Sequence, residues 1–172
     1  MSNNLPDDVA RTIRARLAAA PSQMTLQLAR DLGVPEADVI RCMPEGRSVE
    51  LDATHWRQLL EAMPPFGRVH VIVSNEAVTL EANGEFGNFS TAGDFFNVQT
   101  KTLDMHIRWP SLGAVFAVEK PSHQTGISTL SFQFYDKDGN SAFKVFLTIG
   151  NHAAPPSMLK RFEELRAKHK LA

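Results

Sequence analysis

Before about residue 65, the hydrophobic residues of this chain recur at the spacings of helices. Val9, Ile13 and Leu17 fall on one helical face, and Pro21 ends that first helix. Further helices are predicted over residues 25–32, 35–43 and 52–63, from polar cap residues, a glycine and flanking prolines. Residues 1–64 are therefore expected to form a helical N-terminal part, either in the same domain or as a cap on it.

From Phe66 onward the hydrophobic period changes to two, which is typical of β-strands. Val69, Val71 and Val73 share one face of the first strand. Further strands are predicted over residues 77–81, 95–100, 103–109, 114–119, 129–135 and 141–149. A flexible connection is expected at Gly84, Gly87 and Gly93. Asp138 and Gly139 favour a tight turn between the last two strands.

The end of the chain, after Pro155 and Pro156, predicts an amphipathic helix over residues 157–170. The strands lie too close in sequence for parallel crossovers, which need a dozen or more residues. The predicted fold class is therefore α+β, with a helical N-terminal part, an antiparallel sheet of about seven strands and a C-terminal helix. Residues 65–172 would hold the sheet and last helix, and the whole chain reads as one compact domain.

Composition narrows the classes of function that this fold could serve. Lys and Arg number 18 against 19 Asp and Glu, so a net charge of −1 gives no bulk attraction to nucleic acid. Cys42 is the only cysteine, which excludes an intrachain disulfide and a zinc–thiolate cluster. The N-terminus is polar and charged, and no apolar run is long enough to span a bilayer. We expect a soluble cytoplasmic protein.

Residues 24–44 resemble a helix-turn-helix, with two short helices joined by a turn at Gly33. Glu36 and Asp38 stand at the start of the second helix, where a DNA reader would approach base edges and phosphates. Carboxylates there repel phosphate and suit the helix dipole instead. A helical cap on the sheet is therefore favoured over specific DNA binding.

Two of the six histidines, His70 and His106, lie within predicted strands, and no HxxxH, HExxH or HxH pair is present. Alternation places His106 on one face with Asp104 and Arg108, and His70 on one face with Ser74. Such a polar face is either exposed to solvent or lines a ligand cleft. In the second interpretation, the imidazole is a ligand for haem iron and the adjacent arginine pairs with a propionate.

Three blocks of sequence resemble the HutX/ChuX family of intracellular haem-utilisation proteins. They are VTLEANGEF at residues 78–86, GDFFNVQTKTLDMHIRW at 93–109 and FQFYDKDGNSAFKVFL at 132–147. The resemblance extends over residues 25–150, and it rests on the order and spacing of the blocks. It implies a fold similar to one half of HemS/ChuS, a homodimer, and a cytosolic carrier or store of haem b.

The resemblance also implies a set of site residues. The triplet His106-Ile107-Arg108 matches a family position at which the histidine has been linked to haem. Ser74 and Phe95 stand where other members have a histidine and a tyrosine, so His106 is the one inherited iron ligand. The expected contacts are listed by role: His106 as axial ligand, Phe95 and Phe96 on the macrocycle, Arg108 and Lys144 near propionates, and His70 and Ser74 as further haem-contacting candidates.

Three functions remain open from the sequence. The first is a haem carrier or store, with haem-delivery proteins as possible partners. The second is a dimeric interaction or regulatory module that keeps the fold but has lost haem, which the residues Ser74 and Phe95 would explain. The third is an enzyme that degrades haem, which needs an electron donor and access for oxygen. Binding without catalysis is the favoured expectation.

Overall fold

Strands between Ser48 and Phe146 form two antiparallel sheets in the computed structural model, which describes residues 5–123, 127–150 and 152–172. The larger sheet has the strand order β1-β7-β8-β9-β2-β3. Its strands are β1 (Ser48–Leu51), β2 (Arg68–Ser74), β3 (Thr79–Glu85), β7 (Leu112–Pro121), β8 (Ser128–Asp136) and β9 (Ser141–Phe146). The smaller sheet consists of β4 (Phe89–Ala92), β5 (Phe95–Gln99) and β6 (Asp104–Arg108), in that order.

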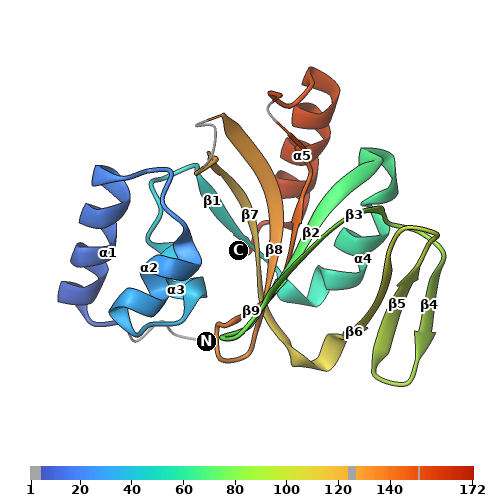
Figure 1. The fold of residues 1–172 in the computed structure, drawn as a ribbon, viewed down its shortest axis with the longest axis horizontal. Helices are drawn as coiled ribbons and strands as arrows, with labels where there is room; N and C mark the ends of the chain where they lie inside the picture. The colour runs from blue at the N-terminus through green and yellow to red at the C-terminus, as the bar shows by residue number, and fades with distance from the viewer. Residues whose placement is uncertain (1–4, 124–126, 151) are drawn as a thin grey trace.

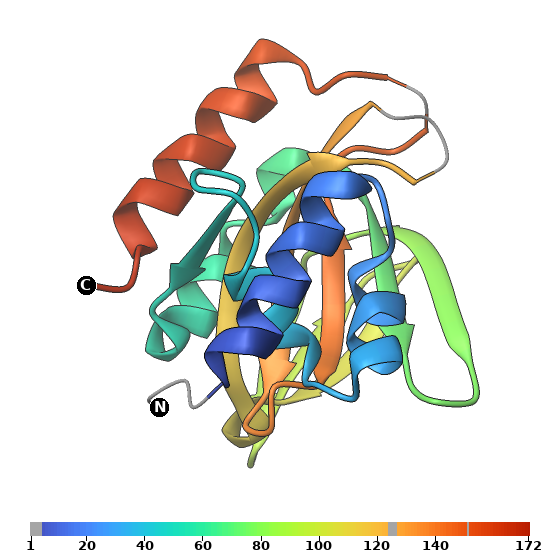
Figure 2. The same ribbon diagram turned by 90° about the vertical axis from the view of Figure 1, so that its left-hand side faces the viewer.

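Helices cover both faces of the larger sheet (Figures 1 and 2). The helices are α1 (Asp7–Ala19), α2 (Thr25–Leu32), α3 (Glu36–Arg41), α4 (Trp56–Glu61) and α5 (Pro156–His169), with 3₁₀ turns η1 (Ala53–His55), η2 (Pro64–Phe66) and η3 (Trp109–Ser111). On one face, Ala37 and Ile40 of α3 pack against Phe116 and Tyr135. The other face is covered by α4 and α5. Because side chains alternate along a strand, each face of the larger sheet packs on its own set of helices.

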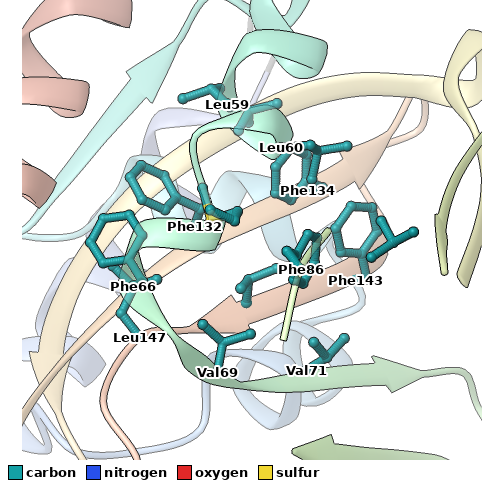
Figure 3. Packing of buried hydrophobic residues seen from close by; sticks show 14 of the residues in the cluster. Leu59, Leu60, Phe66, Val69, Val71, Phe86, Phe132, Phe134, Phe143 and Leu147 are labelled. Atoms are coloured by element: carbon teal, nitrogen blue, oxygen red, sulfur yellow. The ribbon is translucent and has the colours of Figure 1, made fainter. Parts of the chain in front are cut away.

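The main hydrophobic core lies between the larger sheet, α4, α5 and the smaller sheet. Figure 3 shows Phe132 and Phe134 of β8 beside Leu59 and Leu60 of α4. Phe134 also stacks on Phe143, with ring centroids 4.4 Å apart. Because these side chains are fully buried or nearly so, truncating one to alanine would cost about 2–5 kcal/mol of folding free energy.

The α+β fold class predicted from the sequence is confirmed, with two differences in its strands. The first is β1, which lies within the segment expected to be helical. Its four residues are too few for a clear alternation, and the strand is defined by its pairing with β7. The second is the expected connection at Gly84, Gly87 and Gly93. This segment contains the end of β3 and all of β4. Because β3 belongs to the larger sheet and β4 to the smaller one, the chain passes here from one sheet to the other.

Helix starts also differ from the predicted caps. Thr25 is the first residue of α2, and its hydroxyl donates to the carboxylate of Glu36 instead of capping the helix. Asp52 does act as a cap, but for η1, where its side chain accepts a hydrogen bond from the Thr54 backbone N–H at 2.9 Å. Among the described residues, every helix is too short or too polar to cross a lipid bilayer.

Candidate functional site

His106 lies at the middle of β6, which forms one edge of the smaller sheet. The β5–β6 register places Asn97 directly opposite His106, and Phe95 directly opposite Arg108. Directly opposed residues share a face of an antiparallel pair, so these four side chains form one outward face. Phe96 alternates to the inward face, where it is fully buried and packs edge-to-face on Trp56.

The His106 imidazole is held at one nitrogen and open at the other. Its Nδ1 lies 2.8 Å from Oδ1 of Asn97, a hydrogen-bond distance. Its Nε2 lies 3.6 Å from Oδ1 of Asp104, which is beyond a hydrogen bond. The side chain is 58% exposed. A ligand such as a metal ion can therefore reach Nε2 from solvent.

An apolar cleft of about 530 Å³ adjoins His106. Its lining includes all of β6, together with Val71 and Val73 of β2 and Leu80 and Ala82 of β3. Val73 and Leu80 are exposed large hydrophobic residues that face each other across the β2–β3 pair. A largely apolar cleft of this size, with a few polar groups at its edge, is the usual form of a cofactor-sized binding site.

The charge of the cleft is mixed. Arg108 is the one cation among the described residues that line it, and Asp104 and Asp136 are the carboxylates. The Arg108 guanidinium donates to the Ser111 hydroxyl at 3.0 Å and lies 3.6 Å from a carboxylate oxygen of Asp94. It is 59% exposed, so donors remain available for an anionic group of a ligand.

The structure brings together three of the residues predicted from sequence, His106, Phe95 and Arg108. Phe95 is 41% exposed and offers a ring edge or face on the same surface as the imidazole. It has no oxygen that could bind iron. Phe96 shares the strand but not this surface, so the predicted contact of both phenylalanines with one macrocycle is reduced to Phe95.

The other three candidates lie on the opposite face of the larger sheet, because they alternate with the valines that line the cleft. Lys144 is paired with the buried carboxylate of Glu36, with Nζ 2.5 Å from Oε1. Ser74 forms a hydrogen bond with Thr79, with 3.0 Å between their hydroxyl oxygens. His70 lies on the same face, so all three are separated from the His106 surface by the sheet.

Two contributors to the site were missed by sequence reasoning. Asn97 lies in the block at residues 93–109, but its contact with His106 depends on the β5–β6 register. Leu80 lies in a predicted strand, but the sequence pattern alone does not give the residue opposite it, which is Val73. The alternation of β5, which puts Asn97 on the face of Phe95, is the one signal that could have found the amide. Within the described part of the chain, no group of three or more His, Cys, Asp or Glu side chains could hold a metal ion.

Comparison with known proteins agrees with the family resemblance of the sequence. The model of the haem utilisation ChuX/HutX family matches residues 49–165. The intracellular heme transport protein HutX of Vibrio cholerae is 23% identical over 167 residues, which cover 95% of this chain and 86% of that protein.

Two solved structures share the fold. The heme binding protein ChuX has a TM-score of 0.78 at 21% identity, over 91% of this chain and 97% of that one. The heme degrading enzyme ChuS of Escherichia coli O157:H7 has a TM-score of 0.76 at 19% identity, over 95% of this chain but only 47% of that one. This chain therefore corresponds in structure to about half of ChuS.

Proposed function

The chain belongs to the ChuX/HutX family of haem utilisation proteins, and we propose that it binds haem b and carries or stores it in the cytoplasm. His106 would bind the iron through Nε2, and the porphyrin would lie against the apolar cleft. Haem is the cargo in this function, and no step of its chemistry is assigned to the protein.

The observation that carries the proposal is the open Nε2 of His106 beside an apolar cleft of about 530 Å³. A porphyrin supplies four nitrogen ligands of its own, so one imidazole from the protein is enough to hold the iron. This agrees with a site that has one strong donor and no multi-ligand metal group among the described residues. Burial of the macrocycle against the cleft lining would provide most of the affinity.

Arg108 and Phe95 complete the proposed site. The exposed guanidinium of Arg108 can pair with a propionate, and the ring of Phe95 can contact the porphyrin edge on the same face. Lys144 has no place in this proposal, because its ammonium group is paired with Glu36. His70 and Ser74 are likewise left out, since they alternate away from the cleft.

A titration of purified protein with haemin tests this function. We expect a saturable Soret band for the wild-type protein and a loss of at least tenfold in affinity for His106→Ala. His70→Ala is the matched control, because it removes a strand histidine from the other face, and it should bind haemin as the wild type does. If the wild type shows no saturable Soret change, the carrier function fails and a module that has lost haem is favoured.

A homodimer is also part of the proposal. The chain covers only 47% of ChuS, so two chains would supply the two halves that ChuS holds in one. Light scattering in solution should give twice the mass of the chain, and a monomer would contradict this assembly. The name of the Vibrio cholerae relative, an intracellular heme transport protein, supports the cytoplasmic location.

A further inference from the structure

We propose that Asn97 is a positioning residue, which fixes the proton of His106 on Nδ1 and thereby presents Nε2 as the nitrogen that binds iron. The consequence for iron binding rests on the proposed function. The arrangement itself is a property of the protein without haem. Asn97 lies in β5, the central strand of the smaller sheet, and is only 7% exposed.

The direction of the hydrogen bonds around Asn97 decides which nitrogen of His106 carries the proton. The Asn97 amide nitrogen donates to the Ser90 hydroxyl oxygen at 3.0 Å. That hydroxyl in turn donates to Oε1 of Gln99 at 3.3 Å. The amide oxygen of Asn97 therefore faces His106. A carbonyl oxygen only accepts, so Nδ1 of His106 must be the donor across the 2.8 Å contact.

With the Gln99 amide oriented as observed, the reverse orientation of the Asn97 amide satisfies fewer groups. The Asn97 amide nitrogen would then donate to Nδ1, and the Ser90 hydroxyl would turn to the amide oxygen, leaving Oε1 of Gln99 without this donor. The His106 proton would move to Nε2, where the nearest carboxylate oxygen, on Asp104, is 3.6 Å away and outside hydrogen-bond distance. Beside Gln99 as observed, the observed orientation of Asn97 is thus the better hydrogen-bonded one.

The consequence for iron is direct. With the proton on Nδ1, the lone pair of Nε2 is free in the ground state of the protein, so binding needs no change of tautomer. The hydrogen bond to Asn97 also fixes the ring orientation and raises the basicity of the ligand nitrogen. Register places Ser90 and His106 on either side of Asn97, so the amide is held from both neighbouring strands.

His70 provides an internal comparison. Its Nδ1 lies 3.0 Å from Oδ1 of Asn83, which is the same kind of cross-strand pairing. Its Nε2, however, lies 3.0 Å from Oε2 of Glu81, and its side chain is only 24% exposed. The described part of the chain therefore holds two histidine–asparagine pairs, and of these only the pair at His106 leaves Nε2 out of hydrogen-bond contact.

The test replaces Asn97 and follows both the free protein and the haem complex. In the protein without haem, long-range ¹H–¹⁵N NMR should show His106 protonated at Nδ1 in the wild type. In Asn97→Leu it should show a shift toward the Nε2–H form. Haemin affinity should fall by about tenfold to a hundredfold in Asn97→Leu, the range typical of groups that orient a metal ligand.

Asn97→Asp is the conservative variant. A carboxylate still accepts from Nδ1–H, so it should keep the tautomer and the affinity. The stronger acceptor should also lower the reduction potential of bound haem relative to the wild type. Asn83→Leu is the matched control and should leave haemin affinity within twofold. Because Asn97→Asp keeps a polar group of similar size, the inference remains testable if Asn97→Leu fails to fold.

Three results would overturn the inference. The first is an Nε2–H tautomer of His106 in the free wild-type protein, and the second is an Asn97→Leu tautomer identical to that of the wild type. The third is a haemin affinity that Asn97→Leu leaves unchanged. Failure of the wild type to bind haemin would instead defeat the proposed function, and the NMR result would still decide the role of Asn97 in the free protein.

Discussion

The Glu36–Lys144 pair illustrates how a single contact reassigns a residue. Glu36 has a side chain that is 1% exposed and that of Lys144 is 12% exposed, so their ion pair is buried between α3 and β9. Glu36 also accepts a hydrogen bond from the Thr25 hydroxyl. The sequence placed Glu36 at a helix start, where its carboxylate repels phosphate and suits the helix dipole, and predicted Lys144 near a propionate. In the structure each is the other's partner.

Lys144→Met tests this reassignment. The substitution leaves the Glu36 carboxylate buried without its cation, so we expect a loss of about 3–5 kcal/mol in the free energy of unfolding, measured by urea denaturation. Haemin affinity of the folded variant should stay within twofold of the wild type. The double variant Glu36→Gln/Lys144→Met should recover most of the lost stability. A selective loss of haemin affinity, with stability retained, would restore the propionate role of Lys144.

His169 gives a pH dependence to stability. It is 4% exposed, its ring packs on His55 at 5.1 Å, and neither Nδ1 atom has a hydrogen-bond partner among the described residues. Burial, followed by the nearby His55 and Lys168, lowers the pKa of His169 below its ordinary value. The unfolded chain therefore binds the proton more readily than the folded one.

The sign of the effect follows from this difference. As the pH falls from about 7 through the ordinary histidine pKa of about 6.5, the unfolded state gains a proton first, and the free energy of unfolding should decrease. His169→Phe keeps a ring of similar shape without the titrating group. We expect a shallower pH dependence of stability between pH 7 and 5 for this variant in denaturation experiments. An identical pH profile would show that His169 does not contribute to the pH dependence of stability.

At the scale of elements, the predicted helices and strands were mostly found, because their hydrophobic periods are long enough to read. The C-terminal helix and the β8–β9 hairpin are examples, the latter fixed by a glycine at residue 139 with φ +83°. What the sequence could not supply was the pairing. The division into two sheets, and the cross-strand contact of Asn97 with His106, depend on register and on tertiary packing.

Gly84 shows how the two sheets are coupled. It lies in β3, and a Cβ there would stand 2.8 Å from the Leu103 Cβ and 3.1 Å from the Thr102 carbonyl oxygen. The loop before β6 therefore packs directly on the β3 backbone. Leu103 also lines the cleft, so this contact helps to set the distance between β3 and β6.

Gly84→Ala should force these elements apart. We expect a loss of about 1–3 kcal/mol in stability from overpacking, together with weaker haemin binding, as measured by denaturation and Soret titration. Gly87→Ala is the control, since a Cβ at that position would meet only the Thr100 methyl at 3.7 Å. If both variants behave alike, close packing at Gly84 does not define the cleft.

At the scale of the whole molecule, the family and the α+β class could be predicted from sequence, because they depend on the order of long segments. The site could be predicted only in part. His106 and Arg108 share a face by simple alternation, and the structure adds Phe95 to the same surface. Phe96, Lys144, His70 and Ser74 were grouped with them, and separating these four required the layers of the fold.

In the whole molecule, His106 has an open nitrogen at the edge of an apolar cleft, and we propose that haem iron binds there. The most direct measurement is an anomalous difference map at the iron edge from crystals of the haemin complex. We expect an iron peak at bonding distance from Nε2 of His106, with the porphyrin beside Val73 and Leu80. An iron peak at His70, or one that contacts no side chain of β6, would contradict it.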